Sequence, residues 1–284
     1  MQLLEGKPLA KRLQAELSGQ AQVLASGGDQ PRLAVLLAGD DPGSRWYAQA
    51  KAKLGARLGI DVLVEKVPGD ATTEALTALL ERWNADPTVH GILVELPLPP
   101  QVATATVLAG IAPHKDVDCV CPTNRGRLFA GDEVGLLLPA TPQSCIELLE
   151  SVPCELSGAR AVVVGRGETV GRPLAAMLVS RHCTVTICHT RTQNLADVTR
   201  QADLLMVAAG RTGLVTAELV GQDMVVVDAG INEVDDALVG DVDFDAVAPI
   251  VRAITPVPGG VGTLTTSIIM RNVLQAARQQ RKTN

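Results

Sequence analysis

The stretch TPVPGGVGTLT, residues 255–265, combines two prolines with three glycines. Proline removes a backbone donor and fixes φ, while glycine permits positive φ and lets a ligand approach the main chain. Apolar residues then recur every three or four positions from Leu264 to Leu274, which is typical of an amphipathic helix. The sequence predicts a rigid loop that leads into a terminal helix over 264–282. A tight structural turn is the alternative, but this composition favours a loop that offers amides to a flat polar ligand.

Aliphatic runs alternate with helical patterns in two blocks. In the first block we expect three buried strands, at 32–39, 60–67 and 91–97. Helices near 44–58 and 72–84 should separate them, and a helix near 7–25 should precede them. In the second block the expected strands are 160–165, 184–188, 203–210 and 224–230. Such alternation predicts parallel sheets with right-handed crossovers. Two prolines within 136–144 mark the change of block and predict a hinge there.

The composition supports this fold class and narrows the function. The 284 residues are 46% hydrophobic but only 2% aromatic, so the cores must consist of Ala, Val, Leu and Ile, as in parallel sheets covered by helices. A net charge of −6 argues against binding to nucleic acid or to anionic lipid. No apolar run approaches the length of a membrane span, and residues 1–12 lack the apolar core of a signal peptide. We therefore expect a cytoplasmic protein.

The six cysteines include no CxxC pair, and in a cytoplasmic chain we expect them to be reduced. His114, Cys119 and Cys121 are the nearest approach to a ligand set, but their spacing fits no zinc pattern and a fourth ligand is missing. We expect no metal.

A glycine-rich loop follows the first strand of the second block. Gly165, Gly167 and Gly171 have the spacing G-x-G-x-x-x-G, one residue longer than the dinucleotide fingerprint. Because a strand precedes the loop and a helix follows it, the amides of the helix N-terminus would face a pyrophosphate. A tight strand-to-helix turn is the alternative interpretation.

The end of the next strand indicates which dinucleotide binds. NAD sites usually place Asp or Glu there, whereas this strand ends in His189, Thr190 and Arg191. Arg166 follows the first glycine of the loop, and guanidinium groups bind phosphate well. These residues favour the 2′-phosphate of NADP, and we assign His189 to the rim of the cofactor site.

The chain resembles the bifunctional methylenetetrahydrofolate dehydrogenase/methenyltetrahydrofolate cyclohydrolases. The resemblance rests on PVPGGVG and on eight further motifs, which stand in the family's order along nearly the whole chain: GDDPGSRWYAQAKAK, GILVELPLP, KDVDC, TNRGRL, VVVGRGETVGRP, CHTRTQNL, VDAGIN and GDVDF. It implies a two-domain α/β fold with a cleft between the domains. A folate-binding catalytic domain would comprise 1–139 plus 264–284, and a Rossmann-like NADP-binding domain would comprise 140–263. It also implies a homodimer.

The resemblance assigns a folate site to a helix of the first block. Ser44, Tyr47 and Lys51 stand at positions i, i+3 and i+7 and so share one helix face, which by itself is more typical of a solvated surface. In the family, however, SxxYxxxK is the folate and catalytic motif. The resemblance implies that Tyr47 packs on the folate rings, that Lys51 is the reactive amine and that Asp118 binds the pterin. Without the resemblance, Asp118 would read as a loop-capping residue.

The resemblance extends to further binding residues. For the tetrahydrofolate substrate they are Pro258, Gly259, Gly260 and Val261. For the cofactor NADP they are the glycine-loop and strand-end residues given above, together with Ala209, Gly210, Asp228, Gly230 and Ile231.

Glu95 departs from the family pattern, which has glutamine at this position beside the reactive lysine. A carboxylate there would form an ion pair with Lys51 and favour its ammonium form, and an ammonium is a poor base. Glu95 could itself transfer protons and is a candidate catalytic residue. The sequence therefore predicts dehydrogenation with a weakened cyclohydrolase step.

Several other positions, near the folate pocket and in the cofactor loop, depart from the pattern as well. Cys119 and Cys121 replace Gly and His, Ala140 replaces Cys, Thr263 replaces Pro, and Gly167 stands where most members have Ser, which would remove one phosphate hydrogen bond. These changes leave two alternatives open: a dehydrogenase for another cyclic iminium or amine, and a folate- or nucleotide-binding regulator without turnover. The presence of Lys51 and Asp118 argues against a complete loss of activity.

Overall fold

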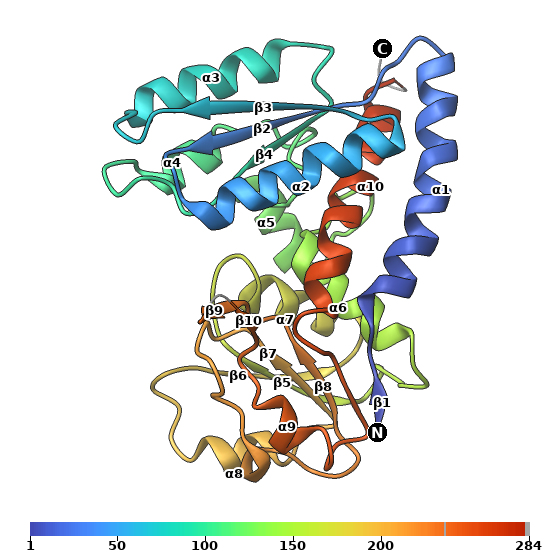
Figure 1. The fold of residues 1–284 in the computed structure, drawn as a ribbon, viewed down its shortest axis with the longest axis vertical. Helices are drawn as coiled ribbons and strands as arrows, with labels where there is room; N and C mark the ends of the chain where they lie inside the picture. The colour runs from blue at the N-terminus through green and yellow to red at the C-terminus, as the bar shows by residue number, and fades with distance from the viewer. Residues whose placement is uncertain (236, 282–284) are drawn as a thin grey trace. The chain divides into compact units, whose positions relative to one another are not determined.

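The computed structural model describes residues 1–235 and 237–281 (Figure 1). The chain divides into two compact units, which we name by their sheets. The six-stranded unit comprises Met1–Lys11, Leu128–Gly131 and Pro139–Thr265. The three-stranded unit comprises Arg12–Arg127, Asp132–Leu138 and the described part of Thr266–Asn284.

A parallel sheet in the order β3-β2-β4 organises the three-stranded unit; its strands are β2 (Arg32–Ala38), β3 (Asp61–Val67) and β4 (Gly91–Val94). The central strand β2 reads RLAVLLA and is buried along almost its whole length, as a parallel strand covered on both faces must be. None of the residues of β3 is buried, so the expectation of a buried strand there is wrong. Among the described strands it pairs with β2 alone, and its edge position lets Asp61, Glu65 and Lys66 stay in contact with water.

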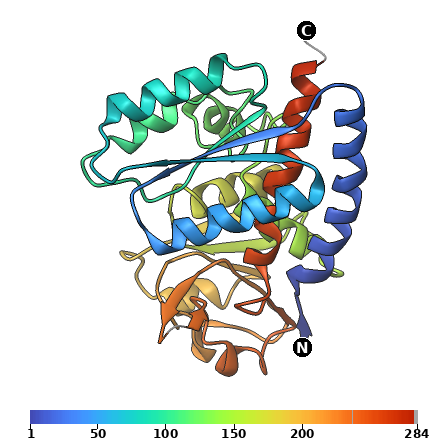
Figure 2. The same ribbon diagram turned by 45° about the horizontal axis from the view of Figure 1, so that its top comes forward.

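Helices cover this sheet, and Figure 1 and Figure 2 show α2 and α3 on opposite faces of it. The helices that lie wholly or partly in this unit are α1 (Gly6–Ser26), α2 (Pro42–Leu58), α3 (Thr73–Ala85), α4 (Thr104–Ala109), α5 (Pro122–Phe129) and α10 (Val261–Arg281). Asp41 caps the start of α2 by accepting a hydrogen bond from Ser44 N, and Gly59 ends that helix in the left-handed conformation. These caps fix both ends of the helix that carries the SxxYxxxK motif.

The six-stranded unit contains a wholly parallel sheet in the order β1-β11-β8-β7-β5-β6. Its strands are β1 (Gln2–Leu3), β5 (Arg160–Val164), β6 (Thr184–Cys188), β7 (Leu204–Val207), β8 (Val225–Asp228) and β11 (Ala253–Ile254). An antiparallel hairpin stands apart from it, with strands β9 (Asn232–Val234) and β10 (Ala237–Val239). The helical segments are α6 (Ala140–Glu150), α7 (Gly171–Ser180), α8 (Leu195–Thr199), a 3-10 turn (Ala217–Leu219) and α9 (Phe244–Val247).

The expected α/β fold with parallel sheets is confirmed. The sequence did not reveal β1, β11 or the β9–β10 hairpin, because two- and three-residue strands carry almost no periodic signal. It also missed α6, since Pro139 and Pro142 suggested only a hinge. Both prolines stand at the start of that helix, where their missing N–H groups have no intrahelical partner to lose. No helix within 1–235 or 237–281 combines the length and apolar character that crossing a bilayer requires.

Candidate active site and cofactor-binding loops

Lys51 and Glu95 form a buried ion pair in the three-stranded unit. Lys51 lies on α2, and Glu95 directly follows β4, where its backbone N–H donates to the carbonyl of Leu36 across 2.9 Å. Lys51 Nζ donates to Glu95 Oε1 across 2.8 Å, although the two residues are only 7% and 9% exposed. Burying a charge is costly unless an opposite charge with good geometry meets it, and here each residue is the partner of the other. The ion pair expected from the sequence is confirmed.

Ser44 and Tyr47 lie on α2 beside this pair. Lys51 Nζ is 5.4 Å from the centre of the Tyr47 ring, within the range of cation–π attraction. Burial, followed by the nearby charge of Glu95, raises the pKa of the Tyr47 phenol, so the group is neutral at physiological pH. The buried Ser44 Oγ lies 3.2 Å from the carbonyl oxygen of Leu96. The structure thus brings together an amine, a phenol and a carboxylate from the predicted set.

Asp118 is half-buried, and the loop that carries it is fixed by hydrogen bonds to a second aspartate, Asp116. The fully buried carboxylate of Asp116 accepts hydrogen bonds from Val120 N at 3.0 Å, Cys121 N at 2.9 Å and Asn124 Nδ2 at 3.0 Å. These hydrogen bonds fix the backbone at Val120 and Cys121, directly after Asp118 in the chain. Asp118 belongs to the same unit as Lys51, and its role in pterin binding stays a prediction.

Helix α10 holds the same loop from its other side. Asn272 Nδ2 donates to the carbonyl oxygens of Val117 and Leu138, at 2.8 Å each. Sequence reasoning missed both Asp116 and Asn272. The only signal for Asp116 was the doubled aspartate of KDVDC, and Asn272 lies 155 residues from its partner Val117.

The two cysteines of this loop are buried, and Cys119 adopts φ 54°, which is uncommon for a residue other than glycine. Burial is the largest cause that raises the pKa of the Cys121 thiol to about 12, and it raises the pKa of the Cys119 thiol as well. Both thiols are therefore protonated at neutral pH and are poor nucleophiles and poor metal ligands. Within 1–235 and 237–281, no three His, Cys, Asp or Glu side chains are grouped to hold a metal ion.

In the six-stranded unit, the glycine-rich loop joins β5 to α7 in very little space. Gly165 adopts φ 125°, and a Cβ at this position would overlap the carbonyl oxygen of Ala208. A Cβ at Gly171, the first residue of α7, would likewise overlap the carbonyl oxygen of Gly165. Arg166 and Gly167, between them, are exposed. The loop therefore presents backbone and one guanidinium group at a helix N-terminus, an arrangement suited to phosphate.

The end of β6 lies beside this loop. Val164 of β5 pairs with Cys188 of β6, so His189–Arg191 emerge at the same edge of the sheet as the glycine loop. His189 N donates to Thr192 Oγ1 across 2.9 Å, and Arg191 N donates to His189 Nδ1 across 3.1 Å, which folds the segment into a turn. Thr190 and Arg191 are exposed. The edge thus carries hydroxyl and guanidinium groups and no carboxylate from this turn.

The remaining cofactor candidates lie at the end of β8 or follow β7 and β8. Ala209, Gly210 and Ile231 are exposed, whereas Gly230 is buried. Asp228 is only 2% exposed, and its carboxylate accepts hydrogen bonds from backbone N–H groups. The Asp228 side chain is therefore used for hydrogen bonds inside the protein. Whether any of these five residues contacts a cofactor stays a prediction.

The proline- and glycine-rich loop leads into α10, as its sequence predicts, although the helix begins earlier than expected, at Val261. Gly259 adopts φ 120°, and its carbonyl oxygen accepts a hydrogen bond from Gly6 N at 2.9 Å. Thr263 Oγ1 donates back to the carbonyl oxygen of Gly260 across 2.7 Å, within the first turn of the helix. Pro258–Val261 belong to the six-stranded unit, and their contact with substrate stays a prediction.

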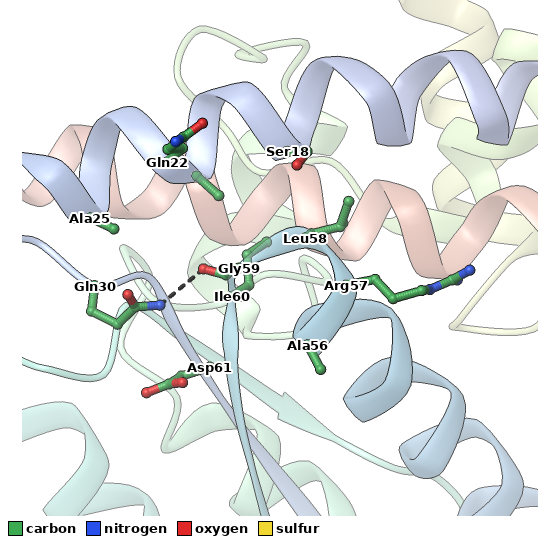
Figure 3. Close-up of a pocket in the computed structure, with 11 residues that line it drawn as sticks. Ser18, Gln22, Ala25, Gln30, Ala56, Arg57, Leu58, Gly59, Ile60 and Asp61 are labelled. Atoms are coloured by element: carbon green, nitrogen blue, oxygen red, sulfur yellow. Dashed lines mark hydrogen bonds between the residues drawn. The ribbon is translucent and has the colours of Figure 1, made fainter.

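A surface pocket of about 530 Å³ lies elsewhere in the three-stranded unit, between α1 and the segment where α2 ends and β3 begins (Figure 3). Gln30 Nε2 donates to the carbonyl oxygen of Gly59 across 2.9 Å at its rim. None of the described residues that line this pocket belongs to the predicted sites.

Comparisons with known proteins match nearly the whole chain. Residues 4–118 match the catalytic domain of the tetrahydrofolate dehydrogenase/cyclohydrolase family, and residues 139–281 match its NAD(P)-binding domain. The bifunctional protein FolD of Heliobacterium modesticaldum is 51% identical, over 98% of this chain and 97% of its own length.

Solved structures agree with these matches. The FolD enzyme of Campylobacter jejuni superimposes with a TM-score of 0.96 at 42% identity, covering 98% of this chain and 99% of that one. The Trypanosoma brucei enzyme, described as complexed with NADP cofactor and inhibitor, gives a TM-score of 0.95 at 34% identity, covering 99% and 98%. The resemblance inferred from the motifs is therefore confirmed, and the chain belongs to the tetrahydrofolate dehydrogenase/cyclohydrolase family.

Proposed function

We propose that this protein oxidises 5,10-methylenetetrahydrofolate to 5,10-methenyltetrahydrofolate with NADP as the hydride acceptor. The observation that carries the proposal is the buried Lys51 amine, held by Glu95 and facing Tyr47, in a chain of this family. The Trypanosoma relative, whose structure contains NADP and an inhibitor, supports the choice of cofactor.

The six-stranded unit fits NADP. At Gly165 and Gly171 the backbones pack so closely that no side chain has room, which leaves amides to meet a pyrophosphate. Exposed Arg166 and Thr190 would hold the 2′-phosphate, because the guanidinium and hydroxyl donors meet no competing carboxylate from the His189–Thr192 turn. When bound, NADP supplies the acceptor for the hydride.

The three-stranded unit fits the folate. We assign Asp118 to the donor-rich pterin, Tyr47 to ring packing and Ser44 to a further substrate contact. We also assign substrate contacts to the loop Pro258–Val261, which belongs to the six-stranded unit. On this assignment the catalytic domain comprises 1–139 plus 264–284, and the NADP-binding domain comprises 140–263. A carboxylate on a loop with a fixed backbone loses little freedom on binding, which favours affinity.

The dehydrogenation requires little acid–base catalysis by the protein. A ring-nitrogen lone pair of the substrate drives the departure of the hydride, so the main contributions of the protein are proximity and electrostatics. The Lys51–Glu95 pair has no net charge, and a cationic methenyl product therefore meets no uncompensated positive charge there.

Hydrolysis of the methenyl product to 10-formyltetrahydrofolate is the second activity of the family, and we propose that it is weakened here. That step needs a base for the attacking water, and an ammonium group in an ion pair has no lone pair to offer. The Lys51 side chain is engaged with Glu95 Oε1 across 2.8 Å in a buried pair.

We further assign the protein to the cytoplasm as a homodimer. The departures at Cys119, Cys121, Ala140 and Thr263 support two rival functions, namely oxidation of another cyclic iminium or amine and folate or nucleotide binding without turnover.

An absorbance assay with methylenetetrahydrofolate and NADP distinguishes these three functions. We expect reduced cofactor to form with methylenetetrahydrofolate and NADP, with much less formed from NAD, and none from tetrahydrofolate that lacks the one-carbon unit. Turnover of a different cyclic amine alone would favour the first rival. Binding of both ligands without any turnover would favour the second.

A further inference from the structure

Two buried carboxylates tie together three loops at the carboxyl edge of the six-stranded sheet. The loops are Ala209–Arg211 after β7, Ala229–Ile231 after β8 and Gly240–Val242 after β10. The carboxylates belong to Asp228 and Asp241, which are 2% and 0% exposed. In doubly wound sheets, ligands bind outside the carboxyl ends of the strands, so these loops stand at the position where a cofactor is expected.

Asp241 accepts hydrogen bonds from three consecutive backbone N–H groups. Its Oδ2 lies 2.6 Å from Ala209 N and 2.8 Å from Gly210 N, and its Oδ1 lies 2.8 Å from Arg211 N. Asn232 Nδ2 donates to the same Oδ1 across 2.9 Å. Ala209–Arg211 are exposed, so a fully buried side chain fixes the backbone of a surface loop.

Asp228 holds the segment that contains Asp241. Its Oδ1 accepts from Gly230 N at 2.8 Å, and its Oδ2 accepts from Val242 N at 2.9 Å. The two carboxylates also occupy the space over each other's loops. A Cβ at Gly230 would overlap the Asp241 carboxylate, and a Cβ at Gly240 would overlap that of Asp228. The three loops therefore form one interlocked unit.

The order of the strands assigns the loop Ala209–Arg211 to one half of the cofactor. The glycine loop after β5 suits the pyrophosphate, and the turn after β6 suits the adenosine ribose. The nicotinamide half must then extend the other way, over β7 and β8. We propose that Asp241 is a positioning residue for the nicotinamide half of NADP, because it fixes the Ala209–Arg211 backbone before the cofactor binds. The proposal rests on the proposed use of NADP.

The chemistry of the carboxylate makes Asp241→Asn a sharp test. Each carboxylate oxygen accepts from two N–H donors. An amide presents one oxygen and one NH₂ group, so in either orientation two of the four donors face another donor. An unsatisfied buried donor is costly, and the loop must shift to relieve it. The variant has nearly the same size as the wild type, so it leaves no cavity.

Asp243→Asn is the matched control. Asp243 is exposed, and it caps α9 by accepting from Ala246 N at 3.2 Å. It is two residues from Asp241 and its side chain also accepts from a backbone N–H, but that N–H belongs to α9 and not to one of the three loops. Asn is as good a helix cap as Asp, so this variant should behave as wild type. Asn232→Ala, which removes only one of the four donors, is a milder change should Asp241→Asn not fold.

The first readout is amide hydrogen exchange at residues 209–211 in the protein without cofactor. We expect exchange there to accelerate roughly tenfold or more in Asp241→Asn and to remain at the wild-type rate in Asp243→Asn. Asn232→Ala removes one of the donors that hold the Asp241 carboxylate in place, so it should accelerate exchange at residues 209–211 to a smaller extent. Unchanged exchange in both Asp241→Asn and Asn232→Ala would overturn the proposal.

The second readout compares two ligands. NADP affinity should fall roughly tenfold or more in Asp241→Asn. The affinity for 5-formyltetrahydrofolate should change much less, because its predicted contacts with Tyr47 and Asp118 are made by the other unit. Equal losses for both ligands would indicate general damage and overturn the positioning role. A wild type that does not bind NADP would instead contradict the proposed function, and the exchange measurement would still test the hold of Asp241 on its loop.

Discussion

Lys51 Nζ and Glu95 Oε1 lie 2.8 Å apart in the interior of the three-stranded unit, and each charge is the other's partner. Removing one member of a buried pair leaves a charge that water cannot reach, which typically costs about 3–5 kcal/mol. Any hypothesis about the chemistry of this site must therefore treat the two residues together.

The substitution Glu95→Gln should raise methenyltetrahydrofolate hydrolysis relative to dehydrogenation. An amide still accepts a hydrogen bond from Lys51 but carries no opposite charge, so it holds the amine less strongly and leaves it freer to act as a base. General-base assistance is typically worth 10²–10⁴-fold, so a change of about that order is expected. Following the methenyl and NADPH absorbances together should show methenyl product accumulating in the wild type and less of it in the variant.

Glu81→Gln provides a control for that comparison, since Glu81 is exposed on α3, and it should leave both activities unchanged. If the wild type hydrolyses the methenyl compound rapidly and Glu95→Gln slows it, Glu95 is itself the base and the inhibitory role is wrong.

The substitution Arg166→Ala should weaken NADP binding much more than NAD binding. Only NADP carries the 2′-phosphate, and a hydrogen bond to a charged group contributes about 1.5–3 kcal/mol, or roughly tenfold or more in affinity. Arg172→Ala is a suitable control, because Arg172 is exposed on the same loop-and-helix segment but pairs with Glu168. Titrations of both cofactors check the result. An equal loss for both, or a wild-type preference for NAD, contradicts the assignment.

The substitution Asp118→Ala should reduce folate affinity and leave NADP affinity unchanged. Loss of a charged acceptor for the pterin donors is expected to cost about 2 kcal/mol or more. Tyr47→Ala should show the same selectivity through loss of ring packing. Asp132→Ala is the control, since Asp132 is exposed in the same unit and pairs with Arg127. Calorimetric titration with a folate analogue distinguishes the variants; wild-type protein that fails to bind folate at millimolar concentration would favour another substrate.

The sequence predicted those features that depend on local pattern. The run RAVVV followed by glycines identified β5 and its loop, and the spacing of Tyr47 and Lys51 placed both on one helix face. The pairing of Lys51 with Glu95 needed the resemblance as well, because the two residues are 44 positions apart.

The features that the sequence did not reveal depend on distant contacts. Asp241 was only the first of the two aspartates of GDVDF, and its partners Ala209–Arg211 lie about 30 residues earlier. Strands β1 and β11 pair at opposite ends of the chain through two residues each. In both cases the information lies in the folded arrangement, since a buried acceptor has no signature until its donors are placed around it.

The buried carboxylate of Asp228 should make stability depend on pH in the weakly acidic range. Burial is the largest cause that raises the pKa of Asp228 to about 6 from 3.8; hydrogen bonds from backbone N–H groups oppose the shift, and the charge of Asp241 adds to it. A carboxyl whose folded pKa is raised stabilises the fold fully below about pH 4, and this contribution disappears as the pH rises through about 6. Between pH 5 and pH 7 this contribution to the free energy of unfolding should fall by about 1 kcal/mol.

The measurement is the difference in unfolding free energy between the wild type and Asp228→Asn, determined in denaturant at both pH values. The amide of the variant does not titrate. The difference should shift in favour of the wild type as the pH falls from 7 to 5. A shift in the opposite direction would mean that the backbone donors, not burial, control this carboxyl group.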